Sequence, residues 1–289
     1  MSNIVIIGAT VSSHTIALRL SERLSNSNIT LVSEEDYPAY DHLKLADFIS
    51  GVASEKDMFL CGEDFYTEHK INFLKSKKAS ILNVQKKSVY FKDRGSINYD
   101  FLVIATGKSP VLPDIPGVRK DGVYRLYTLD DVKGFLKRYI AEPVCIVGAD
   151  VFALKIAEAV TEKYKVEVKL LSCRAFDPGL VPKNVEVIND SIQEIIGEGE
   201  AQAVKLACGK AIAISAVLFM DNYKSNIEFL KNTQVAVKDG LVIIDDYMQT
   251  TVKNIFACGS ITGKDSVVVS MMLADNVIRQ AQGEVCRIS

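Results

Sequence analysis

The sequence predicts an α/β protein with two Rossmann-like, three-layer nucleotide-binding domains. Its length of 289 residues is typical of about two domains. Two apolar runs, at residues 3–7 and 143–147, each end in a glycine and are followed by a helical pattern and another apolar run. Because a continuous apolar run fits a strand that is buried on both faces, each of these segments predicts a β-α-β unit of a parallel sheet.

The first β-α-β unit begins almost at the N-terminus. We expect strands at Asn3–Ile7 and Asn28–Val32, joined by a helix from Val11 to Leu24. Gly8 lies at the turn between the first strand and the helix, and Glu34 follows the second strand. In a dinucleotide-binding fold, an acidic residue at this strand end binds ribose, so the unit predicts a nucleotide site.

The second unit repeats the pattern later in the chain. Strands at Pro143–Val147 and Val166–Leu171 flank a helical pattern from Val151 to Lys163, and Gly148 lies at the turn. This internal repeat predicts two domains built from one template.

The residues between the two units predict antiparallel strands and a linker. Short runs at Ser80–Val84 and Ser88–Phe91 are typical of an antiparallel piece, whereas Phe101–Ala105 is another buried strand. The proline-rich stretch from Pro110 to Gly117 is typical of an interdomain linker, and we expect a second crossing near residues 245–248.

Composition argues against several classes of function. The net charge of −2 and the lack of a basic block disfavour nucleic-acid binding. No run of about 18 apolar residues is present, and the N-terminus lacks the basic start of a secretory signal. The six cysteines form no C-x-x-C pair and the three histidines share no ligand spacing. We therefore expect a cytoplasmic protein that binds no metal, membrane or nucleic acid.

The first glycine turn is an incomplete dinucleotide fingerprint. In the full pattern G-x-G-x-x-G, the glycines allow a tight turn, approach of the pyrophosphate and close helix packing. Here Gly8 remains, Thr10 takes the second glycine position and Ser13 takes the third. The amides at the helix N-terminus still favour an anion, so the turn can bind a nucleotide or can be an ordinary α/β turn.

Four further segments carry a family resemblance. Residues 34–45 resemble an acidic segment followed by Y-D-R-x-x-L, and residues 100–110 resemble Y-D-x-L-V-I-A-T-G-x-x-P. Residues 240–250 resemble G-I-V-V-D-x-x-x-x-T, and residues 254–260 resemble I-Y-A-A-G-D. In this order, the segments resemble the FAD-dependent pyridine-nucleotide oxidoreductases. The branch that they resemble most contains NADH:rubredoxin reductases and the flavoprotein part of NADH-dependent nitrite reductases.

The resemblance implies that the second domain is inserted into the first. It places an FAD-binding domain at residues 1–112 and 245–289 and an NAD(P)H-binding-like domain at residues 113–244. His42 stands where the family usually has Arg, and Ser260 stands where it has an Asp that bonds the ribityl chain. The residues that it assigns to FAD are Gly8, Ala9, Thr10, Val11, Ser12, Ser13, Glu34, Glu35, His42, Lys44, Ala105, Thr106, Gly107, Gly259 and Ser260.

The corresponding NAD(P)H loop departs further from its pattern. It comprises Gly148, Ala149, Asp150, Val151 and Phe152. Asp150 takes the place of the second glycine, and a carboxylate close to a phosphate is repulsive. Arg174 could favour a 2′-phosphate without removing that repulsion. Two interpretations stay open: an exposed Asp150 in a vestigial domain, or weakened use of NADH.

Two charged positions suggest a reversed ion pair. Related reductases often carry Lys at position 47 and Glu at position 155, whereas this chain has Asp47 and Lys155. One hypothesis is that the pair persists with reversed signs and joins the two domains at the flavin edge. The alternative is coincidence on two solvated faces.

Three functions follow from the resemblance. The first is an FAD-dependent oxidoreductase that transfers electrons from NAD(P)H or a protein donor to a small redox protein or another acceptor. The second is a flavoprotein electron-transfer subunit that does not use NAD(P)H, and the third is a non-catalytic nucleotide-binding or assembly protein. A redox protein of ferredoxin or rubredoxin type, or a partner subunit, is the expected partner. Because the family usually continues with a further C-terminal domain, we expect a more open flavin and a docking place on that side.

Overall fold

The computed structural model describes the chain except for residue 63 and residues 139–141, 174–177 and 284–289. Contacts among the described residues divide it into two compact units. The first unit comprises Met1–Tyr40, Phe59–Lys108 and the described residues from Ser225 onward, and the second comprises Asp41–Met58 and Ser109–Lys224. The domain boundaries inferred from the sequence stay a prediction; they differ from these units at residues 41–58, 109–112 and 225–244.

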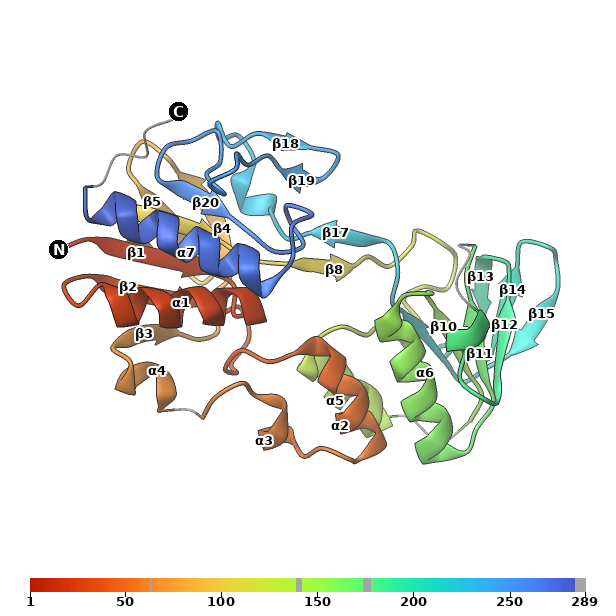
Figure 1. Ribbon diagram of the computed structural model, residues 1–289. Coiled ribbons are helices and arrows are strands. Elements are labelled where there is room, and N and C mark those ends of the chain that lie inside the picture. The colour runs from red at the N-terminus through yellow and green to blue at the C-terminus, as the bar shows by residue number, and fades with distance from the viewer. Residues whose placement is uncertain (63, 139–141, 174–177, 284–289) are drawn as a thin grey trace. The chain divides into compact units, whose positions relative to one another are not determined.

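A parallel sheet forms the centre of the first unit (Figure 1). All of its neighbouring strands are parallel. Its order is β20 (Ile255–Ala257), β7 (Phe101–Ile104), β1 (Asn3–Ile7), β2 (Asn28–Val32) and β3 (Ile71–Leu74). Because β1 is apolar at successive positions, Ile4 and Ile6 enter one core cluster while Val5 and Ile7 enter another. The strand is therefore buried on both faces, as its composition predicts.

Different layers cover the two faces of this sheet. Helices α1 (Val11–Arg23) and α7 (Val267–Ala281) pack together and supply residues to the cluster that contains Ile4 and Ile6. The antiparallel strands β4 (Ala79–Asn83), β5 (Ser88–Phe91) and β6 (Ser96–Asn98) form a separate sheet. Side chains of β4 and β5 join the cluster that contains Val5 and Ile7. The first unit thus has the predicted three layers (Figure 1).

The second unit repeats the plan. Its parallel sheet has the order β12 (Val185–Ile188), β11 (Val168–Leu171), β10 (Val144–Val147), β16 (Ala216–Phe219) and β9 (Val123–Arg125). Helix α6 (Val151–Tyr164) follows β10. A separate antiparallel sheet contains β13 (Ile192–Ile196), β14 (Ala203–Leu206) and β15 (Ala211–Ala213). The predicted α/β class with two Rossmann-like units is confirmed.

Shorter elements complete the described chain. In the second unit they are the 3₁₀ turn η1 (His42–Lys44), α2 (Leu45–Ser50), α3 (Glu55–Met58), α5 (Leu129–Arg138) and the 3₁₀ turn η2 (Pro178–Leu180). In the first unit they are α4 (Phe65–Glu68), the 3₁₀ turn η3 (Glu228–Leu230), β18 (Val237–Lys238) and β19 (Leu241–Val242). Strands β8 (Lys108–Pro110) and β17 (Tyr223–Ser225) lie where the chain passes from one unit to the other.

Two features are absent from the described residues. No helix there is both long and apolar enough to cross a membrane. No group of three or more His, Cys, Asp or Glu side chains there is arranged to hold a metal ion.

Candidate nucleotide-binding site

The candidate site lies at the carboxyl ends of three adjacent strands of the first unit. The turn after β1 contains Gly8 and Thr10, the turn after β7 contains Thr106 and Gly107, and the turn after β20 contains Gly259. In open α/β sheets, ligands bind in the crevice outside these strand ends. The structure therefore brings together three segments that the sequence analysis assigned to the cofactor separately.

Gly8 is required by close packing between the first two of these turns. Its φ is +109°, and a Cβ placed on it would lie 2.3 Å from the carbonyl oxygen of Ala105. Such a contact is sterically impossible, and L-residues rarely adopt this φ. The retained glycine therefore fixes the β1 turn against the end of β7.

Thr10 and Ser13 form a capping box at the start of α1. The Ser13 amide donates to the Thr10 hydroxyl at 3.3 Å, and the Thr10 amide donates to the Ser13 hydroxyl at 2.7 Å. The first amides of a helix have no intrahelical acceptor, so this cap leaves those of Val11 and Ser12 for a ligand. The two departures from the glycine pattern thus stabilise the helix, and the amides of its first turn keep the capacity to bind an anion.

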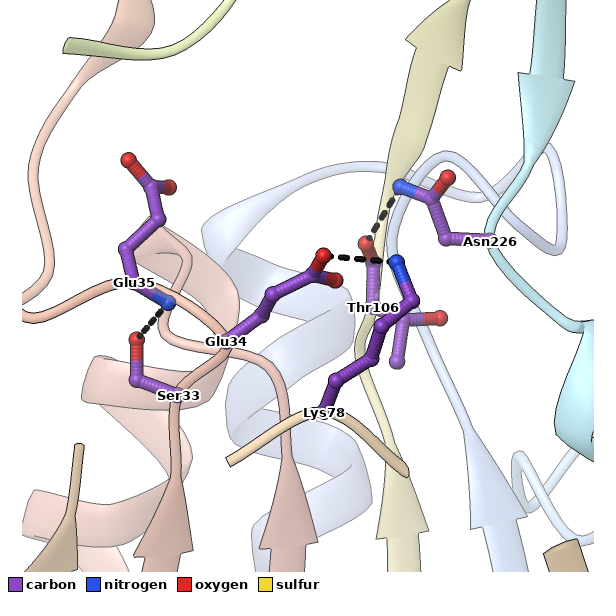
Figure 2. A network of polar contacts seen from close by, with 6 residues as sticks. All are labelled: Ser33, Glu34, Glu35, Lys78, Thr106 and Asn226. Carbon is purple, nitrogen blue, oxygen red and sulfur yellow. Dashed lines mark hydrogen bonds and ion pairs between the residues drawn. The ribbon is translucent and has the colours of Figure 1, made fainter. Parts of the chain in front are cut away.

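Thr106 is an unpartnered polar residue in the turn after β7. Its hydroxyl oxygen is buried and makes no hydrogen bond within the described part of the chain. The backbone around it is fixed, because the Asn226 side chain donates to the Thr106 carbonyl at 3.1 Å (Figure 2). The Asn226 amide also donates to the Gly107 carbonyl at 3.0 Å. A buried hydroxyl without a partner is costly, and a bound ligand would satisfy it.

Glu34 follows β2 and is paired with a lysine. Lys78 Nζ lies 2.6 Å from Glu34 Oε1, and both side chains are more than half exposed. Figure 2 shows this pair. Lys78 contacts only Oε1 of Glu34. Because both oxygens of a carboxylate can accept hydrogen bonds, Glu34 Oε2 can still accept one from a sugar hydroxyl. The sequence analysis missed Lys78, because no local pattern marks a residue 44 positions away.

Glu35, the next residue, is bonded to other residues of the protein. Its carboxylate accepts from the buried Tyr40 hydroxyl at 2.8 Å. Its amide donates to Ser33 Oγ at 3.1 Å (Figure 2). The two neighbouring acids therefore differ, and Glu34 is better placed to contact a ligand.

The turn after β20 contains another carboxylate that the sequence analysis missed. Asp265 accepts from the Ser12 hydroxyl at 3.5 Å, and its Oδ1 lies 3.8 Å from a Cβ built on Gly259. Ser260 Oγ lies 3.9 Å from a Cβ built on Gly107. The turn thus carries both the predicted serine and a carboxylate five residues later. An isolated antiparallel bridge between Gly259 and Lys264 closes the turn and brings Asp265 back beside Gly259.

Cys258 is not suited to redox chemistry. It is buried between β20 and Gly259, and burial, with a smaller contribution from Asp265, raises the pKa of its thiol to about 12. Because the thiolate is the reactive form, this thiol is inert at neutral pH.

The second glycine turn, in the second unit, has the same backbone form but a charged cap. Gly148 has a φ of +154°, and Asp150 is the N-cap of α6. The Asp150 carboxylate accepts from the Ala153 amide at 2.8 Å. Ala149, Val151 and Phe152 complete this predicted NAD(P)H loop. The carboxylate therefore lies where the helix N-terminus would meet a phosphate.

Aromatic side chains of the second unit surround this turn. The His42 and Tyr127 rings stack with centroids 4.4 Å apart. Tyr127 also contacts Phe152 and Tyr223 edge-on. Burial lowers the pKa of His42 to about 4, so its ring is neutral at pH 7. The predicted cofactor role of His42 stays a prediction, as does that of Lys44, whose Nζ donates to the Asp57 carbonyl at 3.4 Å.

The proposed reversed ion pair is not formed. Asp47 lies on α2 and Lys155 on α6, two helices that pack together in the second unit, and both side chains are exposed. No ion pair in the described part of the chain joins them. The geometry favours two solvated faces, and the functional role of the pair stays a hypothesis. Arg174, which was suggested to favour a 2′-phosphate, lies outside the described residues.

Comparison with known proteins supports the family prediction. A family model described as "Pyridine nucleotide-disulphide oxidoreductase" matches residues 2–281. The chain is 23% identical over 263 residues to an assimilatory nitrate reductase electron transfer subunit from Bacillus subtilis, with 84% of this chain and 34% of that protein covered. It is 25% identical over 285 residues to an NADH-rubredoxin oxidoreductase from Clostridium acetobutylicum, with 91% and 68% covered.

Solved structures confirm the fold. A covalent putidaredoxin reductase–putidaredoxin complex matches with a TM-score of 0.86 and 20% identity, covering all of this chain and 77% of the other. The chain spans about one third of the length of the nitrate reductase subunit and about two thirds of that of the rubredoxin oxidoreductase.

Proposed function

Because the chain belongs to the pyridine nucleotide-disulphide oxidoreductase family, we propose that it is an FAD-dependent oxidoreductase that passes electrons to a small redox protein or another acceptor. The first unit is its FAD-binding part. A cytoplasmic location is part of the same proposal.

The buried Thr106 hydroxyl is the observation that carries this proposal. It lies at the carboxyl end of β7 without a hydrogen-bond partner among the described residues, beside the turn that Gly8 and Thr10 form. The Val11 and Ser12 amides, at the start of α1, are also left free by the capping box. Donors gathered at adjacent strand ends fit a ligand that carries both phosphate and hydroxyl groups, as FAD does.

Three groups of the first unit would each contact a different part of FAD. The α1 amides would bind pyrophosphate, Glu34 Oε2 would accept from the adenosine ribose, and Ser260 would offer one hydroxyl to the ribityl chain. When bound, FAD supplies the redox chemistry, while the protein orients the group and sets its environment. The chain itself therefore needs no side chain that acts as a nucleophile.

The names of relatives support the class of partner. One relative is an NADH-rubredoxin oxidoreductase, another is a ferredoxin–NAD(+) reductase subunit, and a structural neighbour is a reductase bound to putidaredoxin. These names describe those proteins. For this chain, we propose a ferredoxin- or rubredoxin-type protein as partner.

One observation favours a second candidate, a flavoprotein subunit that takes electrons from a protein rather than from NAD(P)H. Asp150 places a carboxylate at the N-terminus of α6, where the pyrophosphate of a pyridine nucleotide would bind.

Reconstitution with FAD tests the proposal. The apoprotein should bind one FAD per chain and become yellow, and calorimetry should show a single saturable site. FAD should also raise the midpoint of thermal unfolding, since a ligand that binds the folded state stabilises it. A colourless protein that shows no heat of binding with FAD and no rise in its unfolding midpoint would instead support a non-catalytic role.

A further inference from the structure

The two glycine turns of this chain provide an internal comparison of binding specificity. Thr10 and Asp150 are both N-cap residues directly after a parallel strand and a glycine turn. Their backbones agree, with φ and ψ of −101° and 173° for Thr10 and −83° and 171° for Asp150. The positions therefore differ mainly in the side chain: a neutral hydroxyl in one unit and a carboxylate in the other.

The Asp150 carboxylate occupies the place of an anion at α6. It accepts from the Ala153 amide at 2.8 Å, which is the bond of an N-cap. The positive end of the helix macrodipole and the Val151 and Phe152 amides, which would attract a phosphate, now face a fixed negative charge. At α1 the corresponding cap is neutral, and a nearby carboxylate, that of Asp265, contacts the Ser12 side chain at 3.5 Å rather than capping a backbone amide.

Neighbouring side chains hold this carboxylate in place. The Tyr223 hydroxyl faces Asp150, and burial together with the charge of Asp150 raises its pKa far above neutrality. The hydroxyl therefore keeps its proton as a donor for the carboxylate at physiological pH. Tyr127 contacts both Tyr223 and Phe152, so aromatic rings fix Tyr223 beside the cap, while Asp150 itself is exposed to solvent.

We infer that Asp150 is a specificity-determining residue that excludes pyridine nucleotides from the second unit. If the protein has the proposed function, this exclusion means that its electrons come from a donor other than NAD(P)H; that consequence rests on the proposed function. The exclusion itself concerns binding to the second unit and does not depend on FAD. Repulsion between a carboxylate and a phosphate about 4 Å apart weakens binding by roughly 5-fold in a water-like dielectric, which suits the exposed Asp150, and by up to about 1,000-fold at a lower one.

An exchange of the two cap residues tests this inference. Asp150→Thr removes the charge and keeps a residue that caps a helix. By calorimetric titration with NADH and with NADPH, the wild-type protein should show no saturable binding. Asp150→Thr should show saturable binding of at least one of them, at least about fivefold tighter than the detection limit that the wild-type titration sets. Tyr223→Phe is the matched control. It removes the hydroxyl but keeps the carboxylate and its bond to the Ala153 amide, so it should still bind neither NADH nor NADPH.

The reciprocal variant gives an independent measurement. Thr10→Asp places the carboxylate in the first unit and should weaken FAD binding by a factor in the same range. Saturable binding of NADH or NADPH to the wild-type protein would overturn the inference. The inference would also be overturned if Asp150→Thr binds neither nucleotide although its thermal unfolding midpoint shows that it is folded. The FAD content of the wild-type protein, measured separately, decides the proposed function, so the two failures are distinguishable.

Discussion

At the scale of single residues, the two acids after β2 show how tertiary contacts divide roles between neighbours. Glu34 is exposed and shares one oxygen with Lys78, whereas Glu35 is bonded to the buried Tyr40. The position of an acid at this strand end is predictable from the sequence, because the β-α-β pattern marks where the strand ends. The choice between the two acids is not, since Tyr40 and Lys78 reach them through the folded chain.

This difference predicts unequal effects of two alanine substitutions. Glu34→Ala removes a charged acceptor and should raise the dissociation constant for FAD by about 10- to 100-fold. Glu35→Ala removes the Tyr40 contact and should lower the free energy of unfolding while changing FAD affinity by less than about threefold. Calorimetric FAD titration and urea unfolding measure the two effects. Equal losses of FAD affinity would contradict the assignment.

At the scale of elements, the first glycine turn is better preserved than its sequence indicates. Against the G-x-G-x-x-G pattern, Thr10 and Ser13 count as losses. In the structure they form a capping box that starts α1, while Gly8 keeps the approach to β7. The sequence analysis predicted the start of the helix correctly at Val11. It could not predict the cap, because the reciprocal bonds depend on the backbone that the turn adopts.

Two glycine-to-alanine variants test the role of this turn. Gly8→Ala forces a Cβ to within 2.3 Å of the Ala105 carbonyl oxygen at a φ of +109° and should destabilise the protein by about 3 kcal/mol or more. Gly134→Ala is the matched control. Gly134 lies on α5, and its added Cβ would meet no atom within 4 Å. This change should stabilise the helix by up to about 1 kcal/mol. Urea unfolding that ranks the two variants in the opposite order would contradict the packing argument.

At the scale of the whole molecule, both units have a parallel sheet, a separate antiparallel sheet and a glycine turn before a helix. The sequence repeat predicted this duplication, because buried parallel strands have a strong apolar signature. It left open whether the second turn still binds a nucleotide, since an N-cap Asp is also an ordinary helix start. The Asp150 carboxylate underlies the inference that one unit binds a nucleotide and the other excludes it.

Anaerobic reduction of the FAD-loaded protein tests this account most directly. The flavin absorbance would be followed after NADH, NADPH and a reduced ferredoxin are added to separate samples, with dithionite as the control for full reduction. The account predicts that reduced ferredoxin and dithionite bleach the flavin, while neither nicotinamide does so within the same time. Rapid bleaching by NADH or NADPH would contradict it.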